Sequence, residues 1–193
     1  MIPKLAVFCS GNGSNFEAIL GAIRRRALKA EVAVMVCDNP KAYAIQRAAR
    51  HNVPVAVVSP KLFPSRKSHE EFIIRILKTQ GVEFIVLAGY MRILTPYFIR
   101  AYRGRIANIH PSLLPAFKGA YAIRDAFQAK IRETGATVHV VTEKLDSGPV
   151  IARKKVKLSR RDTLESLEKK IHRAEHTLYP SALQKFIRRG KRR

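Results

Sequence analysis

The feature that most constrains the fold of this chain is a regular alternation of short apolar runs with longer amphipathic segments. The apolar runs are rich in β-branched residues, as buried parallel strands are. They span residues 4–10, 31–37, 53–59, 83–90 and 105–110. Amphipathic segments about as long as crossover helices begin near Asn15, Lys41 and Ser65. Repeated strand, helix, strand units predict an α/β fold with a doubly wound, mostly parallel sheet and right-handed crossovers.

The pattern changes in the last third of the chain. Two strand-like runs, 137–145 and 148–158, flank the turn "DSG" and predict a hairpin that extends the sheet in antiparallel fashion. A final helix is expected to begin near Asp162, with Glu165 completing a capping box three residues later. We expect one domain over 1–193, ending in a basic tail at about 185–193.

Composition indicates a globular chain from a reducing compartment. With 193 residues, of which 47% are hydrophobic, the chain is long enough for a proper core. No apolar run approaches the roughly 20 residues of a membrane span, and the N-terminal apolar stretch is too short for a signal peptide, so we expect the cytoplasm. Cys9 and Cys37 lie in strand-like runs without metal-ligand spacing. They are interpreted as buried thiols, and no metal is expected.

Charge is the unusual property of the sequence. The chain has 37 Lys and Arg against 14 Asp and Glu, a formal net charge of +23. Six of the basic residues lie in the last nine, and other clusters occupy 24–26, 153–155 and 160–161. Such clusters are consistent with a nucleic-acid footprint or with a solvated basic surface. Because no aromatic residues are interleaved with them, the solvated surface is the preferred interpretation.

The junction after the first run reads "SGNGSN", residues 10–15. Glycines let the backbone approach an anion, and a following helix would add free N–H groups and the positive end of its dipole. Ser14 and Asn15 supply further donors. The segment predicts a phosphate site, although a plain tight turn between strand and helix fits the same letters.

A second polar cluster follows the fifth run, in "NIHPSLLP". Asn108 and His110 are two apart in a strand, so both side chains point to one face, where an amide donor and an imidazole suit carbonyl chemistry. Asp146 in the "DSG" turn is a candidate partner that would raise the pKa of His110. A structural histidine and an Asx-type turn cap are the alternatives. Pro111 and Pro115 stiffen the turn, and we expect a cis bond before Pro115.

Five blocks in collinear order carry a resemblance to a known family. They read "CSGNGSNFEAIL", "VLAGYMRILTPYFI", "GRIANIHPSLLPAFKGAYAIRDAF", "GATVHVVTEKLDSGPVIA" and "HRAEHTLYP". From about residue 4 to 186 the chain resembles the folate-dependent phosphoribosylglycinamide formyltransferases of de novo purine biosynthesis. The resemblance implies a Rossmann-like enzyme that moves a formyl group from 10-formyltetrahydrofolate to the amine of 5'-phosphoribosylglycinamide. It implies no metal, no membrane and no specific nucleic acid, and leaves monomer or homodimer open.

The resemblance also implies roles for individual residues. The catalytic residues it implies are Asn108, His110 and Asp146. The residues it implies for the phosphoribosyl substrate are Gly13, Ser14, Asn15 and Glu175. Those it implies for the folate are Arg66, Met91, Arg92, Ile93, Leu94, Thr142, Glu143, Lys144 and Leu145. It places His139 and Tyr121 beside the catalytic residues, and Tyr121 stands where the family usually has a histidine, so we expect its hydroxyl to donate a hydrogen bond near Asp146.

Three other functions fit parts of the sequence. Methionyl-tRNA formyltransferases share "NIHPSLLP", but that family carries a further C-terminal domain and a "PRWRGA" run where this chain reads "PAFKGA". Formyltetrahydrofolate deformylases normally carry an extra N-terminal domain, whereas the first strand begins here at once. A basic nucleic-acid-binding protein without enzymatic activity would need an RNA-reading signature, and none is visible.

Overall fold

The computed structural model describes residues 1–190 and contains one seven-stranded sheet in the order β3-β2-β1-β4-β5-β6-β7. The strands are β1 (Lys4–Cys9), β2 (Glu31–Cys37), β3 (Val55–Val57), β4 (Phe84–Leu87), β5 (Ile106–His110), β6 (Glu133–Val140) and β7 (Val150–Lys157). The first five strands pair in parallel, whereas β6 pairs in antiparallel fashion with β5 on one side and with β7 on the other. The predicted doubly wound sheet with an antiparallel extension is therefore confirmed.

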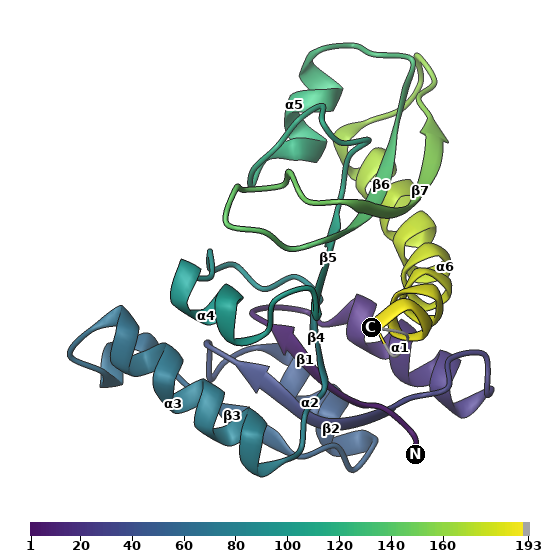
Figure 1. Ribbon diagram of the computed structural model, residues 1–193. Coiled ribbons are helices and arrows are strands. Elements are labelled where there is room, and N and C mark those ends of the chain that lie inside the picture. The colour runs from purple at the N-terminus through teal and green to yellow at the C-terminus, as the bar shows by residue number, and fades with distance from the viewer. Residues whose placement is uncertain (191–193) are drawn as a thin grey trace.

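Helices cover both faces of this sheet (Figure 1). They are α1 (Ser14–Arg24), α2 (Tyr43–Arg50), α3 (Arg66–Thr79), α4 (Pro96–Ala101), α5 (Ala122–Gln128) and α6 (Leu164–Gly190), with a short 3-10 turn, η1 (Pro60–Leu62). Apolar residues of α1, α2 and α6 form one buried cluster with the sheet, and those of α3 and α4 form the other. The central strands are buried on both faces, which is why their sequences read as continuous apolar runs.

Several predicted boundaries were wrong. The fourth strand ends at Leu87 rather than at residue 90, because the chain leaves the sheet at Gly89, whose φ is +78°. The first hairpin strand is shifted toward the N-terminus, to Glu133–Val140, and the second begins only at Val150, so 141–149 form a long connection instead of a tight turn. The short helices α4 and α5 were not predicted.

The start of the last helix also differs from the prediction. Thr163 is the residue that caps α6: its hydroxyl accepts from Ser166 N at 3.2 Å, and Ser166 Oγ accepts from Thr163 N at 3.0 Å. Glu165 instead pairs with Lys169 on the helix surface. The predicted basic tail is also helical as far as Gly190, and 191–193 lie outside the described residues.

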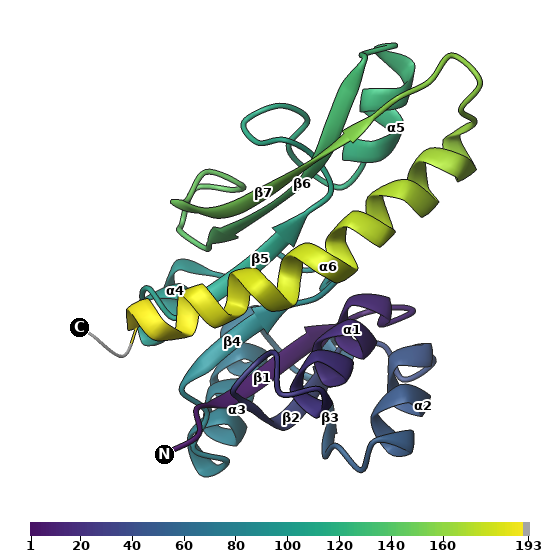
Figure 2. The same ribbon diagram turned by 90° about the vertical axis from the view of Figure 1, so that its right-hand side faces the viewer.

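The first and last described residues lie at one edge of the sheet, where the parallel strands begin (Figure 2). Met1 precedes the first residues of β1. Gly190 packs so closely on the ring of Phe84, the first residue of β4, that a Cβ there would come within 2.5 Å. The carboxyl ends of the parallel strands, where such sheets bind ligands, lie at the opposite edge.

Candidate active site

A cavity of about 410 Å³ opens at the carboxyl ends of β4 and β5. Its wall includes the candidate catalytic residues Asn108, His110 and Asp146, together with His139. Asn108 and His110 come from β5, His139 comes from the neighbouring β6, and Asp146 comes from the 141–149 connection. The fold thus brings together four polar side chains that the sequence separates by up to 38 residues.

The Asn108 amide is oriented by His139, which lies opposite it in the β5–β6 pairing. His139 Nδ1 lies 3.1 Å from the carbonyl of Val140, an acceptor, so this nitrogen carries hydrogen. In the neutral ring, His139 Nε2, 3.2 Å from Asn108 Nδ2, accepts one amide hydrogen, whereas in the protonated ring the same nitrogen donates toward Asp146. The second amide hydrogen of Asn108 is left for a ligand in the cavity.

His110 is held between two acceptors. Its Nε2 lies 2.7 Å from the carbonyl oxygen of Phe117, and its Nδ1 lies 3.6 Å from Asp146 Oδ2. The doubly protonated imidazolium suits this arrangement, since it presents a hydrogen to each acceptor. The side chain is only 6% exposed, so its charge would act through little water.

Asp146 is shared by the two histidines. Its Oδ1 lies 3.6 Å from His139 Nε2, and its Oδ2 accepts a 3.0 Å hydrogen bond from the backbone N–H of Gly119. Burial raises the pKa of this carboxyl, but His139, the Gly119 N–H and the charge on His110 together lower the pKa to about 2. Asp146 is therefore ionised at neutral pH. Its carboxylate accepts from Gly119, 27 residues away in the sequence, and so does not act as the local Asx-type turn cap that was the alternative.

The turn after β5 is fixed by neighbouring side chains. Thr137 Oγ1 donates to the carbonyl of Ser112 and accepts from Leu114 N, and Arg153 donates to the carbonyl of Leu114. The predicted cis bond between Leu114 and Pro115 is confirmed.

A second cavity, of about 650 Å³, adjoins the first at the start of α1. It is lined by residues 10–15, and α1 begins at Ser14 directly after Gly13, whose φ is +74°. A Cβ at Gly13 would come within 2.7 Å of Ala44 Cβ, so this turn requires glycine. Residues from α6 form the opposite wall: Lys169, His172, Arg173 and His176. A helix N-terminus facing these basic side chains is well suited to an anion.

The two cavities meet at Asn15, which lines both of them. Asn15 Nδ2 donates to Glu175 Oε2 at 2.9 Å, and the same oxygen lies 3.0 Å from His172 Nδ1. The hydrogen bond to Glu175 raises the pKa of His172, with burial opposing it. Asn15 Oδ1 is buried without a partner among the described residues, which leaves an acceptor for a ligand.

The segments assigned to folate form the other walls of the first cavity. All of Met91–Leu94 and 142–146 line it. Met91 N donates to Ser10 Oγ at 2.9 Å, and Arg92 Nε lies 2.7 Å from the buried carboxylate of Asp38. These contacts fix the Met91–Leu94 segment to the ends of β1 and β2.

Two predicted site residues lie elsewhere. Arg66 is exposed at the start of α3 and lines neither cavity. Tyr121 is 61% exposed, lies under the guanidinium of Arg124 at 4.2 Å, and its hydroxyl makes no hydrogen bond with the described residues. The backbone N–H of Gly119 is the donor to Asp146 instead.

Sequence reasoning missed the α6 side of the second cavity. Lys169, His172, Arg173 and His176 recur at helical spacing, so they were open to prediction as one face of the last helix. The Asp38–Arg92 pair had no such signal, since its partners are 54 residues apart.

Within residues 1–190, no group of three or more His, Cys, Asp or Glu could hold a metal ion, and no helix is long and apolar enough to cross a membrane.

Comparison with known proteins agrees with this geometry. The family model described as formyl transferase matches residues 3–183. Phosphoribosylglycinamide formyltransferase of Bacillus subtilis is 45% identical over 186 residues, covering 96% of this chain and 95% of the relative. A trifunctional purine biosynthetic protein of Drosophila pseudoobscura is 43% identical, and the match covers 93% of this chain and 13% of that longer protein.

Solved structures give the same result. Phosphoribosylglycinamide formyltransferase from Bacillus halodurans superposes with a TM-score of 0.93 at 44% identity, covering 95% of each chain. Glycinamide ribonucleotide transformylase 1 from Geobacillus kaustophilus gives 0.93 at 51% identity, covering 95% of this chain and 98% of that one. The sheet, the paired cavities and these matches lead to one conclusion: the chain belongs to the formyl transferase family.

Proposed function

We propose that this chain transfers a formyl group from 10-formyltetrahydrofolate to the amine of 5'-phosphoribosylglycinamide, in de novo purine biosynthesis. The chain is a formyl transferase by family, and relatives named for this reaction match it over nearly its whole length. The observation that carries the proposal is the meeting of two cavities at Asn15, one suited to an anion and one lined by Asn108, His110 and Asp146.

The second cavity is proposed to hold the phosphoribosyl substrate. Backbone N–H groups of Gly13, Ser14 and Asn15 would bind its phosphate, with the positive end of α1 and the cations of α6 adding to the attraction. Glu175 lies at the junction of the cavities, where its carboxylate can accept from ribose hydroxyls. The substrate amine would then point into the first cavity.

The first cavity is proposed to hold the formyl folate. Leu87, Leu94, Ile99 and Val141 give it apolar walls against which a flat ring can pack. The Met91–Leu94 segment and the 142–146 segment add backbone polar groups. Arg66 lies outside this wall, and a role for it would require the folate to extend well beyond the cavity.

The proposed chemistry is attack of the amine on the formyl carbon, which puts negative charge on the formyl oxygen. The free amide hydrogen of Asn108 meets that charge, and the imidazolium of His110 stabilises it from beside. The ionised Asp146 keeps His110 charged and helps to move the amine proton, through water, toward the departing folate nitrogen. No metal takes part.

The remaining proposals concern the whole chain. We take 1–193 as one formyltransferase domain, supported by a single sheet with a buried cluster on each face. A cytoplasmic location is supported by the two free, buried thiols, Cys9 and Cys37.

The test is a formyl-transfer assay with purified protein and three acceptors: phosphoribosylglycinamide, charged initiator tRNA and water. Formylation of phosphoribosylglycinamide is expected, and faster transfer to tRNA or water would overturn the proposal.

Asn108→Ala should lower kcat by about 10²–10³ with little change in KM, because it removes a donor used in the transition state. Near-normal kcat in this variant would remove Asn108 from the catalytic residues.

A further inference from the structure

Exposed basic side chains gather at the edge of the sheet where the parallel strands begin. We call this surface the basic edge, and its members are Lys4, Arg24, Arg25, Arg26, Lys29, Lys78, Arg105, Lys185, Arg188 and Arg189. They come from the starts of strands and the ends of helices, so they lie on the side of the molecule opposite the two cavities.

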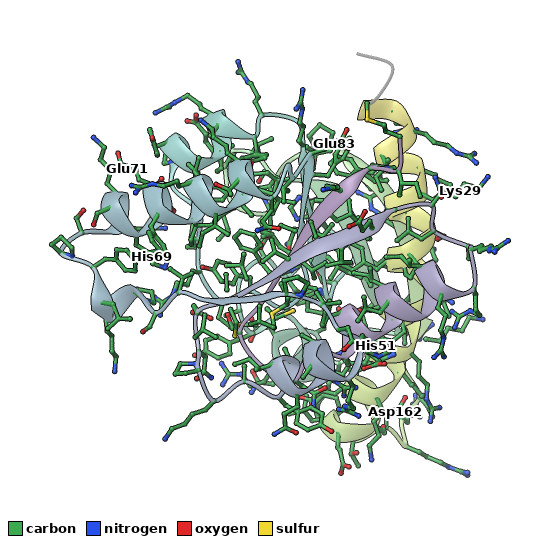
Figure 3. The ribbon with its side chains drawn as sticks, turned by 90° about the horizontal axis from the view of Figure 1, so that it is seen from below. Lys29, His51, His69, Glu71, Glu83 and Asp162 are labelled. Carbon is green, nitrogen blue, oxygen red and sulfur yellow. The ribbon has the colours of Figure 1, made fainter. Side chains whose placement is uncertain are left out.

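Direct contacts join the parts of the basic edge. Lys29 N donates to Gln184 Oε1 of α6 at 2.8 Å, so the loop after α1 lies against the last turns of α6, as Figure 3 shows for Lys29. The end of α6 packs on Phe84, whose strand neighbours Lys4 of β1. Ile85 N in turn donates to the carbonyl of Arg105. These contacts place the loop after α1, the end of α6 and the starts of β1, β4 and β5 next to one another.

Little negative charge opposes this surface. None of the ten side chains makes an ion pair or a side-chain hydrogen bond with any residue in the described range 1–190. The acids at the same edge are Glu31 and Glu83, and one Glu83 oxygen accepts from the backbone N–H of Lys4. The potential outside the basic edge is therefore strongly positive.

Neither helix stability nor substrate capture accounts for the whole surface. Basic residues in the last turn of a helix favour the negative end of its dipole, which accounts for Arg24, Lys78, Arg188 and Arg189. Arg25, Arg26, Lys29, Lys4 and Arg105 lie outside helices. Screening at physiological salt, with a Debye length of about 8 Å, limits what they add at the far edge of the sheet.

We propose that the basic edge binds the phosphate backbone of double-stranded nucleic acid without regard to sequence. Six of its ten members are arginines, whose planar guanidinium bonds a phosphate through two N–H groups. The exposed aromatic side chains, Tyr43, Phe72, Tyr97 and Tyr121, lie on other segments, so stacking on unpaired bases has no support at this surface. Met1 and Ile2 are the large apolar side chains exposed near Lys4, and two such residues without an amphipathic helix give less apolar surface than insertion into a membrane requires.

The experiment measures fluorescence anisotropy of a labelled DNA duplex of about 20 base pairs, titrated with the full chain between roughly 50 and 200 mM KCl. Log K should fall linearly with log salt, with a slope of about −0.9 for each phosphate contacted. The variant Arg24→Gln, Arg25→Gln, Arg26→Gln, Lys29→Gln removes up to four contacts. It should reduce the slope by roughly 3 to 4 and weaken binding about tenfold or more at the higher salt.

A matched control removes the same charge at another place. Lys130→Gln, Arg132→Gln, Arg160→Gln, Arg161→Gln changes exposed residues around the start of β6 and the loop before α6, at the other end of that helix from the basic edge. It should keep the wild-type slope to within about one unit. Both variants should keep full formyl transfer, which shows that they are folded.

Three outcomes overturn the proposal. In the first, the wild-type chain fails to bind the duplex at the lowest salt. In the second, the two variants weaken binding equally, which shows that net charge acts without a defined surface. In the third, vesicles containing phosphatidylserine bind the chain tightly and the duplex does not, which assigns the basic edge to a membrane surface.

Discussion

The most consequential residue of the site is Asp146, a carboxylate that two imidazoles share. Its depressed pKa links the site to stability, because the ionised form is favoured in the folded chain. A carboxyl whose pKa falls from 3.8 to about 2 on folding contributes about 2 kcal/mol above pH 5, and this is lost as the pH falls from about 4 to 2.

We therefore expect Asp146→Asn to be less stable than wild type at pH 6, and the difference to shrink as the pH falls to 2. Urea unfolding at a series of pH values measures it. Asp125→Asn is the control, since that carboxylate is half exposed and, within residues 1–190, forms an ion pair with Arg124 alone. A wild-type advantage that stays constant down to pH 2 would contradict the shared-carboxylate interpretation.

Tyr121 is the position at which the role implied by the family resemblance differs from the contacts seen in the structure. Because its hydroxyl is exposed and unbonded among the described residues, Tyr121→Phe should change kcat by less than about twofold. Phenylalanine also keeps a ring beneath Arg124. The pH dependence of kcat should be the same in wild type, Tyr121→Phe and Tyr121→His. A large gain with histidine and a shifted acid limb would show that a charge is missing at this position.

Residues at strand ends were the predictable part of the site, because parallel strands deliver their carboxyl ends to one edge. Asn108 and His110 could be placed there from their spacing alone. The contact of His110 with Phe117 O depends on the path of the turn after β5, and the partner of Arg92 depends on which loop passes nearby. Neither path is encoded in local periodicity.

At the scale of elements, long segments with clear periodicity were predicted and short ones were not. Helix α4 has six residues, too few to show a face, and its capping residue Thr95 is held by the buried Glu70 of α3, 25 residues away. Tertiary contacts of this kind stabilise short helices that propensity alone would not. Strand β3 is shorter than its apolar run because only β2 pairs with it, at the edge of the sheet.

The corrected start of α6 gives a prediction at this scale. Thr163→Ala should lower the free energy of unfolding by about 1 kcal/mol, because it removes the side-chain acceptor for Ser166 N. Glu165→Ala should have a smaller effect, since the side-chain contact of Glu165 among the described residues is an exposed pair with Lys169. Urea midpoints of the two variants decide between them. A larger loss for Glu165→Ala would restore the capping box expected from the sequence.

At the scale of the whole molecule, two groups of positive charge lie at opposite ends of the parallel strands. One faces the second cavity from α6, and the other forms the basic edge. Capture of a phosphorylated substrate and an anionic folate should depend on the first group, so kcat/KM should fall as salt rises while kcat stays constant.

Measurement of kcat and kcat/KM at a series of KCl concentrations tests whether the charge beside the second cavity, and not the basic edge, governs substrate capture. Lys169→Gln with Arg173→Gln should flatten the salt dependence of kcat/KM, whereas the basic-edge variant should retain it. Equal flattening in both variants would mean that the field of the whole molecule, and not the charge beside the cavity, steers the substrates.

The position of the chain ends has a practical consequence. Both described ends lie at the sheet edge opposite the cavities, so anchoring the protein through either one leaves the mouth of the active site facing outward. An affinity support, a display scaffold or a second enzyme joined there would cover the basic edge first. The kcat of protein immobilised by its N-terminus should consequently equal that of the free protein when substrate transport to the support is not limiting.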